Sequence, residues 1–340
     1  MTHIDRALRS NIKLRHLQLI AALDEFRHLG RTADFLLVSQ PAISKMLMEI
    51  ESMLGLQLFI RSTRGTEPTV AGTSLVRFAR SVLAQYERTR DEIAAVASGV
   101  AGRTRVGTMS GALPVLLSRG IEILKESSAH ASVLVEEGDL THLLPKLRVN
   151  ELDFFVGRLE PGYAAPDLLT EPLYREPMVA IVDSKSPLAR KKQPSWHDFM
   201  DMPCVMPPPW ASLRVKIEQE FYRHGLTPPK DLIETSSYFA ITTFVRERRA
   251  IGFVARSVGL SLQDHGQCKV LALDIPIALP PVGIMTLRDQ HLTSASEHLI
   301  SALRVAAQEL FPPTAESAAA APPPSPAVNP AKTVSRKNRP

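Results

Sequence analysis

The pattern of hydrophobic and polar positions divides the chain into a helical first part and a mixed second part. Between residues 13 and 70, apolar side chains recur at helical spacing in three segments and then alternate in two short ones. The three segments predict helices over "KLRHLQLIAALDEFRH", "LGRTADFLL" and "SQPAISKMLMEIESMLG", the last of which ends at Gly55, a residue type that often terminates helices. The two short segments flank Arg64-Gly65 and predict a β-hairpin.

A long helix is predicted next, from about Ala71 to about Ala97. Its apolar positions form a narrow seam on an otherwise charged helix, consisting of Leu75, Ala79, Val82, Tyr86, Ile93 and Val96. Such a seam is typical of a helix that pairs with another helix, so we favour a dimerising connector over packing against its own domain. The stretch "VASGVAGRTR" that follows is predicted to be a linker.

Beyond the linker, β-like and helical segments alternate. The predicted strands are "TRVGTM", "ASVLVEEG", "LDFFVGRL", "EPMVAIVD", "IGFVAR", "CKVLALD" and "PVGIMTLR". The predicted helices are "ALPVLLSRGIEILKES", "LTHLLPKLRVN", "ASLRVKIEQEFYRHG", "SYFAITTFVRERR" and "SASEHLISALRVAAQEL". Strands separated by helices favour parallel α/β units, in which ligands bind at the carboxyl ends of the strands.

The third helix of the first part has two chemically different sides. Ser39 is a good N-cap, and Pro41 falls in the first turn, where its missing N–H costs nothing. One side carries Ile43, Leu47, Ile50 and Leu54, and another carries Gln40, Pro41, Ser44, Lys45 and Met48. The polar groups of that second side can read base edges and hold phosphates. Two short helices joined by a tight turn then indicate a helix-turn-helix, with plain core packing as the alternative.

The stretch from Leu14 to Gly72 resembles the DNA-binding domain of LysR-type transcriptional regulators. The segments "SQPAISKMLMEIESMLGLQLFIR" and "EPTVAG" match the signature of this family nearly position by position. The resemblance implies an α plus α/β protein: an N-terminal winged helix-turn-helix, a long linker helix and a two-lobed α/β effector domain like periplasmic solute-binding proteins. Within the family, "HLGRTADFLLVSQPAISKML" is similar to a branch that regulates protocatechuate catabolism or sugar-uptake operons.

The resemblance also implies the boundaries of the parts. The winged helix-turn-helix covers residues 1–70, the linker and dimerisation helix 71–98, and the effector-binding domain 103–311, with lobe one at 103–177 and 280–311 and lobe two at 178–279. Residues 312–340 are Pro, Ala and Ser with almost no large apolar side chains. Such a segment cannot bury enough surface to offset the entropy of ordering, so we expect a disordered tail.

Candidate DNA-binding residues follow from the resemblance. It implies that the recognition helix contacts bases and phosphates, and the matching residues are Gln40, Pro41, Ser44 and Lys45. Thr32 and Ser39 match positions that contact the DNA backbone. Arg61 and Arg64 match the wing, which the resemblance implies lies over the minor groove. Thr32 departs from the family, which usually has an alanine there to pack helix two on helix three. We expect altered packing at this position without loss of the motif.

Candidate effector-binding residues lie at predicted strand ends and helix starts. They are Ser110, Gly111, Asp139 and Arg158 in lobe one and Trp210, Ser212, Leu213, Ser237 and Phe239 in lobe two. For each, a helix cap or a structural polar group is the alternative. Arg158 favours a carboxylate, whereas Asp139 would repel a dianion and accept hydrogen bonds from sugar hydroxyls, unless the two neutralise one another. A carboxylated aromatic-pathway metabolite and a sugar or sugar acid therefore both remain candidates.

Composition and charge narrow the class of protein. The formal charge of +5, from 40 basic and 35 acidic residues, permits a polyanionic partner without requiring one. We find no apolar run long enough for a membrane span and no secretory signal, so we expect a cytoplasmic protein. Cys204 and Cys268 are far apart and in no metal or redox pattern, which favours unpaired, reduced thiols.

The sequence lacks the motifs of the common enzyme classes, including GxxxxGK[ST], GxSxG, HExxH and spaced metal ligands. We therefore expect no catalysis, no cofactor and no metal. The resemblance implies a transcriptional regulator whose partners are promoter DNA, RNA polymerase, a small-molecule effector and further copies of the chain in a dimer of dimers. The alternative is a cytoplasmic small-molecule sensor of the solute-binding fold with a degenerate DNA-binding domain.

Overall fold

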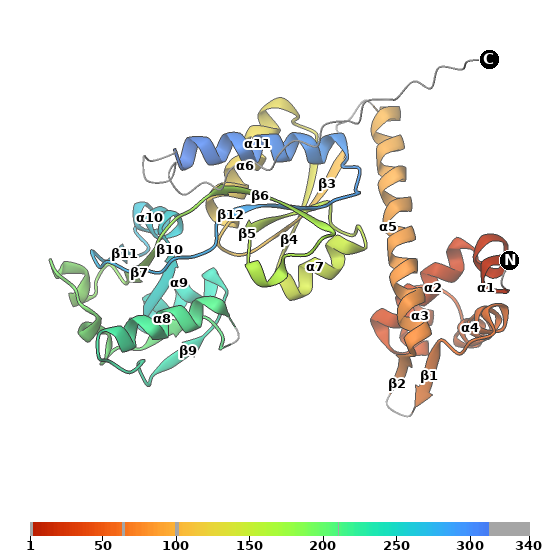
Figure 1. The fold of residues 1–340 in the computed structure, drawn as a ribbon, viewed down its shortest axis with the longest axis horizontal. Helices are drawn as coiled ribbons and strands as arrows, with labels where there is room; N and C mark the ends of the chain where they lie inside the picture. Colours follow the sequence, from red (N-terminus) through yellow and green to blue (C-terminus); the bar gives the residue numbers. More distant parts are fainter. Residues whose placement is uncertain (1–2, 63–64, 99–101, 210, 313–340) are drawn as a thin grey trace, which may run out of the picture.

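The computed structural model describes residues 3–62, 65–98, 102–209 and 211–312. These residues form a helical N-terminal part, one long helix, and two lobes that each contain a five-stranded sheet. The long helix stands between the N-terminal part and lobe one, and lobe two lies on the far side of lobe one (Figure 1). The tail predicted to be disordered lies outside the described residues, apart from Pro312.

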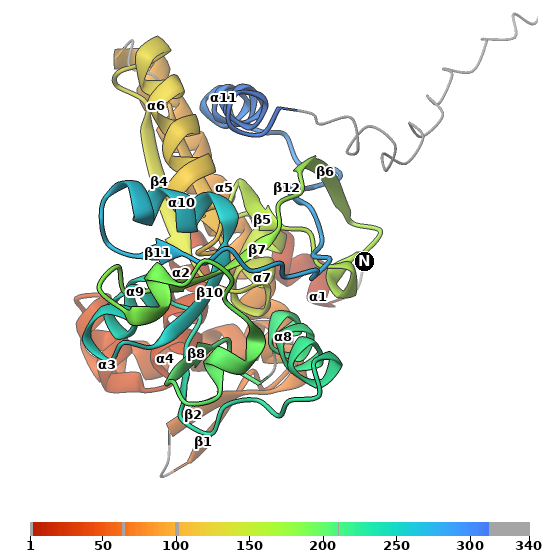
Figure 2. The same cartoon turned by 90° about the vertical axis from the view of Figure 1, so that its left-hand side faces the viewer.

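The N-terminal part contains the three predicted helices and the predicted hairpin. Its elements are α2 (Leu14–Phe26), α3 (Leu29–Phe35), α4 (Gln40–Leu54), β1 (Phe59–Ser62) and β2 (Gly65–Pro68). Two short helical segments that the pattern did not predict precede them, α1 (His3–Arg6) and η1 (Ala7–Asn11). In two views at right angles the hairpin projects from the end of this part (Figures 1 and 2).

The apolar stripe of α4 forms the centre of the N-terminal core. Ile43, Leu47 and Ile50 are completely buried, and they share one cluster with apolar residues of α2 and of the long helix. Gly55 ends α4 in the left-handed conformation expected of a C-terminal glycine, with φ of 66°. The stripe therefore holds α4 against its neighbours, as its spacing predicted.

The long helix α5 (Val70–Ser98) divides the predicted apolar seam between two environments. Leu75 and Ala79 are buried in the N-terminal core, which is the packing that we had considered the alternative. Further along, Tyr86 and Ile93 leave 50% and 65% of their surface exposed. The side chain of Val96 is outside the described set. Among the described seam positions, Tyr86 and Ile93 are thus exposed and available to pair with another helix.

Lobe one is built on a sheet of strand order β4-β3-β5-β12-β6. Its strands are β3 (Arg103–Thr108), β4 (Ser132–Glu137), β5 (Phe154–Arg158), β6 (Leu168–Tyr174) and β12 (Val282–Leu287). Its helical elements are η2 (Leu113–Leu117), α6 (Ser118–Ser127), α7 (Leu140–Arg148) and α11 (Ser294–Leu310). β3 runs parallel to β4 and β5, so the carboxyl ends of these three strands lie at one edge of the sheet.

Lobe two contains the second sheet, of strand order β11-β7-β10-β8-β9. Its strands are β7 (Met178–Val182), β8 (Cys204–Met206), β9 (Leu232–Glu234), β10 (Ile251–Ala255) and β11 (Lys269–Val270), and its longer helices are α8 (Ser212–Arg223), α9 (Tyr238–Glu247) and α10 (Arg256–Asp264). Cys204 and Cys268 are both free and buried, and burial raises their pKa values to about 12 and about 11. Both thiols are therefore protonated at neutral pH.

The expectation of parallel α/β units holds for only part of each sheet. β12 runs antiparallel to β5 and β6, and β10 runs antiparallel to β7. The chain crosses between the sheets twice, after β6 and after β11. The strand that follows each crossing, β7 or β12, runs antiparallel to its neighbours. In the effector domain, β6, β8, β9 and α10 were not predicted, nor were the short helices η3 (Pro161–Tyr163), η4 (Pro187–Arg190) and η5 (Trp196–Phe199). β8 and β9 have only three residues each, too few to show a period.

Gly72 provides a test of how tightly α5 packs on the hairpin. A Cβ at this position would lie 2.0 Å from the Leu58 carbonyl oxygen, which belongs to backbone and cannot rotate away. We expect Gly72→Ala to lower the free energy of unfolding of the N-terminal part by about 2–3 kcal/mol or more.

Gly102→Ala is the matched control, because the nearest atom to its added Cβ is 3.7 Å away. Thermal unfolding followed by circular dichroism measures both variants. Equal unfolding midpoints for the two would contradict this packing.

Candidate DNA-binding surface and effector site

The first turns of α4 present an exposed polar face. The Ser39 hydroxyl accepts a hydrogen bond from the Ala42 N–H at 3.4 Å, so the predicted N-cap is present. Gln40, Pro41 and Lys45 are exposed on the side away from the buried stripe. Amide, ammonium and free backbone N–H groups at a helix start are suited to base edges and phosphates.

The wing meets this face through one hydrogen bond. Arg61 of β1 donates from Nη1 to the Ser44 hydroxyl at 2.8 Å, so the guanidinium lies beside the recognition helix. Arg64 is outside the described residues. Arg61 and Ser44 together therefore extend the polar face of α4 towards the wing.

The wing is anchored to the end of α2. The Thr66 N–H donates to the Arg27 carbonyl oxygen at 2.9 Å, and the Arg27 guanidinium pairs with Glu67 of β2 and with Asp24. Gly65 leaves room for this approach, since a Cβ there would lie 2.8 Å from the same carbonyl. The hairpin is thus fixed at its base.

Thr32 is a predicted DNA contact whose side chain is not accessible at the surface. Its side chain is completely buried, and its hydroxyl donates to the His28 carbonyl oxygen at 2.9 Å, one turn earlier. The position packs inside the domain, where the family has alanine, and the hydroxyl finds its partner locally. Burial of this side chain argues against a side-chain contact between Thr32 and the DNA backbone.

Some of the candidate effector residues meet where the two lobes face each other. The Ser212 hydroxyl, at the start of α8 in lobe two, donates to Glu160 Oε1 of lobe one at 3.2 Å. A Cβ at Gly111 of lobe one would lie 3.4 Å from the hydroxyl oxygen of Tyr238 in lobe two. The carboxyl ends of β3 and β5 thus face the starts of α8 and α9.

Ser110 belongs to the same edge of the lobe-one sheet. Its hydroxyl donates to a carboxylate oxygen of Glu137, which ends the neighbouring strand β4. Glu137, Glu160 and Tyr238 were not among the predicted residues. Glu137 lies near the end of one predicted strand, and Glu160 directly follows another. The rule that identified Ser110 would therefore also have found them.

Asp139 and Ser237 behave as helix caps. The Asp139 carboxylate accepts hydrogen bonds from the Thr141 hydroxyl and, at 3.1 Å, from the His142 N–H, and these bonds hold its pKa below the ordinary value. Ser237 accepts from the Ala240 N–H at 3.4 Å. The structural alternative therefore accounts for both residues without a ligand.

Arg158 lies at the crossing between the lobes. It donates to the Pro280 carbonyl oxygen at 3.1 Å and approaches the Met178 sulfur at 3.9 Å. The suggestion that Asp139 and Arg158 neutralise one another is wrong, because the described contacts place each with other partners. Burial raises the pKa of the neighbouring Tyr238, whereas a hydrogen bond with the Ala255 backbone and the Arg158 charge act in the opposite direction.

The remaining candidates differ in accessibility. Leu213 is partly buried and packs against the core of lobe two. Phe239 leaves 83% of its surface exposed at the start of α9. Trp210 is outside the described residues.

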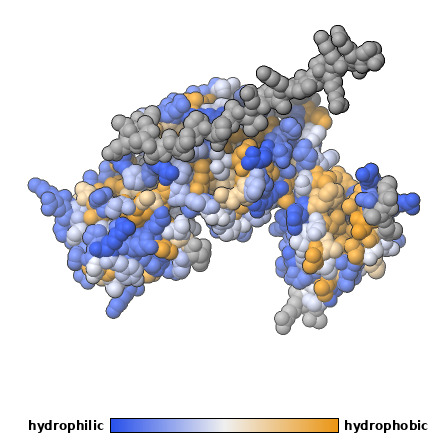
Figure 3. Space-filling model, viewed as in Figure 1, coloured by the Kyte–Doolittle hydropathy of each residue, from blue (hydrophilic) through white to orange (hydrophobic). Residues whose placement is uncertain are grey.

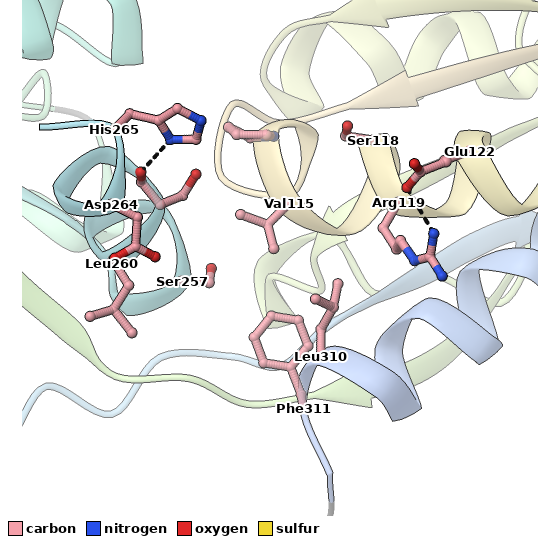
Figure 4. Close-up of a pocket in the computed structure, with 12 residues that line it drawn as sticks. Val115, Ser118, Arg119, Glu122, Ser257, Leu260, Asp264, His265, Leu310 and Phe311 are labelled. Carbon is pink, nitrogen blue, oxygen red and sulfur yellow. Dashed lines mark hydrogen bonds and ion pairs between the residues drawn. The ribbon is translucent and has the colours of Figure 1, made fainter. Parts of the chain in front are cut away.

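Two cavities lie elsewhere in the effector domain. One, of about 380 Å³, is bounded by η2 and α6, by α10 and by the end of α11 (Figure 4). The other, of about 410 Å³, lies in lobe two around Asp183 and Arg246. The first cavity also lies between the two lobes, but neither cavity is lined by any of the described effector candidates, several of which meet at the other interlobe contacts given above.

Two further searches covered the described residues only. No group of three or more His, Cys, Asp or Glu side chains is placed to hold a metal ion. No helix is long and apolar enough to cross a membrane.

The fold and these surfaces define a class of protein: a DNA-binding regulator in which a winged helix-turn-helix is joined by a long helix to a two-lobed effector-binding domain. Two family descriptions match the chain, "Bacterial regulatory helix-turn-helix protein, lysR family" over residues 14–73 and "LysR substrate binding domain" over residues 97–308. The chain belongs to the LysR family of transcriptional regulators, and these are not enzymes.

Individual relatives agree with this assignment. The transcriptional regulator GbpR of Azospirillum brasilense is 31% identical over 302 residues, covering 88% of each chain. The regulator PcaQ of Agrobacterium fabrum is 27% identical over 88% of this chain and 96% of its own. In fold, the chain is similar to the crystal structure of full-length CbnR complexed with its target DNA, which matches 87% of this chain and all of its own at 18% identity and a TM-score of 0.65.

The exposed face of α4 generates a paired prediction. Lys45→Ala should weaken binding to all DNA sequences and reduce the salt slope of log affinity by about one, because it removes one phosphate contact. Gln40→Ala should relax base preference at one position of each half-site, by about 1–3 kcal/mol.

The measurement is fluorescence anisotropy on DNA selected from a random pool by the wild-type chain, at several salt concentrations. Lys192→Ala, at an exposed position in lobe two, is the matched charge control. Wild-type affinity and salt slope in both α4 variants would show that α4 does not enter the groove.

Proposed function

We propose that this LysR-family regulator reads DNA through the first turns of α4 and the wing, by Ser39, Gln40, Pro41, Ser44, Lys45, Arg61 and Arg64. The observation that carries the proposal is the division of α4 into a fully buried stripe and an exposed, capped polar face. The buried stripe fixes the helix, so its polar groups are preorganised for the major groove.

The intact face argues against the alternative of a sensor with a degenerate DNA-binding domain. The N-cap at Ser39, the buried Ile43 and the left-handed Gly55 are all in place. The base of the wing is also fixed, through Thr66 and Arg27. A domain that did not bind DNA would need neither an exposed cationic face nor an anchored wing.

We propose further that a small metabolite binds between the lobes, at the carboxyl ends of β3, β4 and β5. Glu137 and Glu160 each accept a hydrogen bond from a serine hydroxyl there. Carboxylates are strong acceptors for ligand hydroxyls and repel a second negative charge. Arg158 can take one carboxylate through a bidentate pair. These groups favour a sugar or sugar acid.

A carboxylated aromatic-pathway metabolite is the second candidate. Phe239 supplies an exposed ring on which an aromatic ligand can stack, and Arg158 would hold the carboxylate of that ligand. An aromatic monocarboxylate fits these two residues better than a dianion does, because of the nearby acidic side chains. The target would then be an aromatic-acid catabolic operon, whereas a sugar ligand implies a sugar-uptake operon.

Assembly and location complete the proposal. The exposed Tyr86 and Ile93 on α5 support pairing of this helix with that of a second copy. We propose a dimer of dimers that bends promoter DNA in the cytoplasm and acts on RNA polymerase. The effector shifts this assembly between two states in proportion to its difference in affinity for them.

Calorimetry of the full chain with panels of sugars, sugar acids and aromatic mono- and dicarboxylates tests the effector class. We expect a sugar or sugar acid to bind, and Glu160→Gln to weaken that ligand about tenfold or more, since a hydrogen bond to a charged group is lost.

Glu126→Gln on α6 is the control, because this glutamate is exposed and outside the interlobe contacts. Binding of aromatic carboxylates alone would select the second candidate. If no ligand of either kind bound, the proposed site would be wrong.

A further inference from the structure

The carboxylate of Glu51 joins the last turns of α4 to the start of the wing. Its Oε1 accepts hydrogen bonds from the Leu58 N–H at 2.7 Å and from the Phe59 N–H at 3.2 Å. Leu58 and Phe59 are each 1% exposed, so their backbone has little access to water. Without this acceptor, two buried donors would lose a hydrogen-bond partner that solvent cannot readily replace.

The backbone of Glu51 ends the helix at the same place. Its carbonyl oxygen accepts from the Gly55 N–H and, at 3.2 Å, from the Leu56 N–H. Gly55 then turns the chain out of the helix, and β1 begins at Phe59. The carbonyl and the carboxylate of one residue therefore fix both ends of the short segment that connects α4 to β1.

Other bonds attach the wing to α5 and to α2. The Thr69 N–H donates to the Leu58 carbonyl oxygen at 2.8 Å, and the Thr69 hydroxyl donates to the Gln57 carbonyl oxygen at 2.8 Å. Arg27 holds β2 to the end of α2, as described above. The Glu51 carboxylate supplies the attachment to α4.

The wing meets α4 a second time, nearer to the start of the helix. Arg61 Nη1 of β1 donates to the Ser44 hydroxyl at 2.8 Å. Ser44 and Glu51 are separated along α4 by about two helical turns, so both face the same side of the helix, with about 10 Å of its axis between them. The strand β1 is thus tied to α4 at its beginning by Glu51, and its Arg61 side chain reaches the exposed polar face.

We propose that Glu51 is a positioning residue for DNA recognition, which holds β1 against α4 so that Arg61 and the polar face of α4 engage one DNA site together. The inference rests on the proposed function, in which both α4 and the wing bind DNA. Glu51 acts through Arg61 rather than by touching DNA, because its carboxylate already accepts two backbone hydrogen bonds and its charge would repel phosphates.

A fixed wing increases affinity because its contact forms without further ordering of the chain. If β1 were released from α4, the bonds to Thr69 and Arg27 would still hold the hairpin to the domain. Arg61 would, however, no longer be held beside Ser44, and its share of the affinity and of the salt dependence would decrease. The contacts that α4 makes by itself would remain.

Glu51→Ala and Glu51→Gln form a matched pair of variants. Both remove one negative charge, but Gln keeps an amide oxygen that can accept the two N–H bonds, whereas Ala offers no acceptor. A difference between them therefore reports on the hydrogen bonds and not on the charge. Affinity of the full chain for DNA selected by the wild type is measured by fluorescence anisotropy at several salt concentrations, for each variant alone and combined with Arg61→Ala.

We expect Glu51→Gln to bind within about threefold of wild type, and Glu51→Ala to bind about tenfold or more weakly than Glu51→Gln. The salt slope of log affinity should be lower in Glu51→Ala than in Glu51→Gln by about one, the contribution of one cation. Arg61→Ala should cost about tenfold in the Glu51→Gln background and less than about twofold in the Glu51→Ala background, because a displaced guanidinium contributes little to binding.

Lys45→Ala is the control for a general loss of folding. Lys45 is exposed on α4 itself, so its removal should lower affinity by the same factor in both Glu51 backgrounds. Equal affinities and salt slopes for folded Glu51→Ala and Glu51→Gln would overturn the proposal. An equal cost of Arg61→Ala in the two backgrounds would overturn it as well.

Glu51→Asp covers the case in which Glu51→Ala does not fold. Its shorter side chain keeps the charge but withdraws the acceptor from the Leu58 N–H, so we expect it to bind about fivefold or more weakly than wild type. A folded Glu51→Asp with wild-type affinity and the wild-type cost of Arg61→Ala would overturn the proposal. If Arg61→Ala alone had no effect on the wild-type chain, the wing contact of the proposed function would be refuted, which separates the two failures.

Discussion

One helix has to belong to two folded bodies at once, and the arrangement of the whole chain depends on this constraint. The first turns of α5 complete the N-terminal core, with Val76 and Ala79 buried against α2, and its middle turns place Arg88 beside the buried Asp153 of lobe one. Hydrophobic burial fixes the helix at one end, and a buried charge network fixes it at the other. In this structure those two attachments bring the DNA-binding part and lobe one to the same helix.

Helix α4 shows a similar division of roles on a smaller scale. Its apolar stripe is buried in the core, so the opposite side is exposed to solvent and its polar groups are accessible. Figure 3 shows hydrophobic surface gathered on the N-terminal part as well, and Met48 and Ile60 are among its exposed apolar side chains. A surface that mixes exposed apolar groups with cations suits base edges, including thymine methyl groups, and phosphates together.

The winged helix-turn-helix was predictable because its rules are local. Helical spacing located α2 to α4, and Ser39 and Gly55 marked the ends of α4 through backbone geometry that depends on near neighbours. The strand β12 was predicted, but its antiparallel direction was not predictable, since it pairs with β5 from a distant part of the chain. Burial of Thr32 and the approach of Tyr238 to Gly111 likewise depend on distant segments that no local pattern reports. Asp139 shows that a position after a strand is also the usual place for a helix cap, so its place in the sequence does not separate the two roles.

The roles inferred for the other parts of the chain all depend on recognition of particular DNA sequences by its N-terminal domain. The most direct measurement is genome-wide binding of the purified full chain to fragments of its own host DNA at moderate salt. We expect discrete peaks in intergenic regions that share a two-half-site motif. A flat profile, both without ligand and with the sugar, sugar-acid and aromatic panels added, would contradict it.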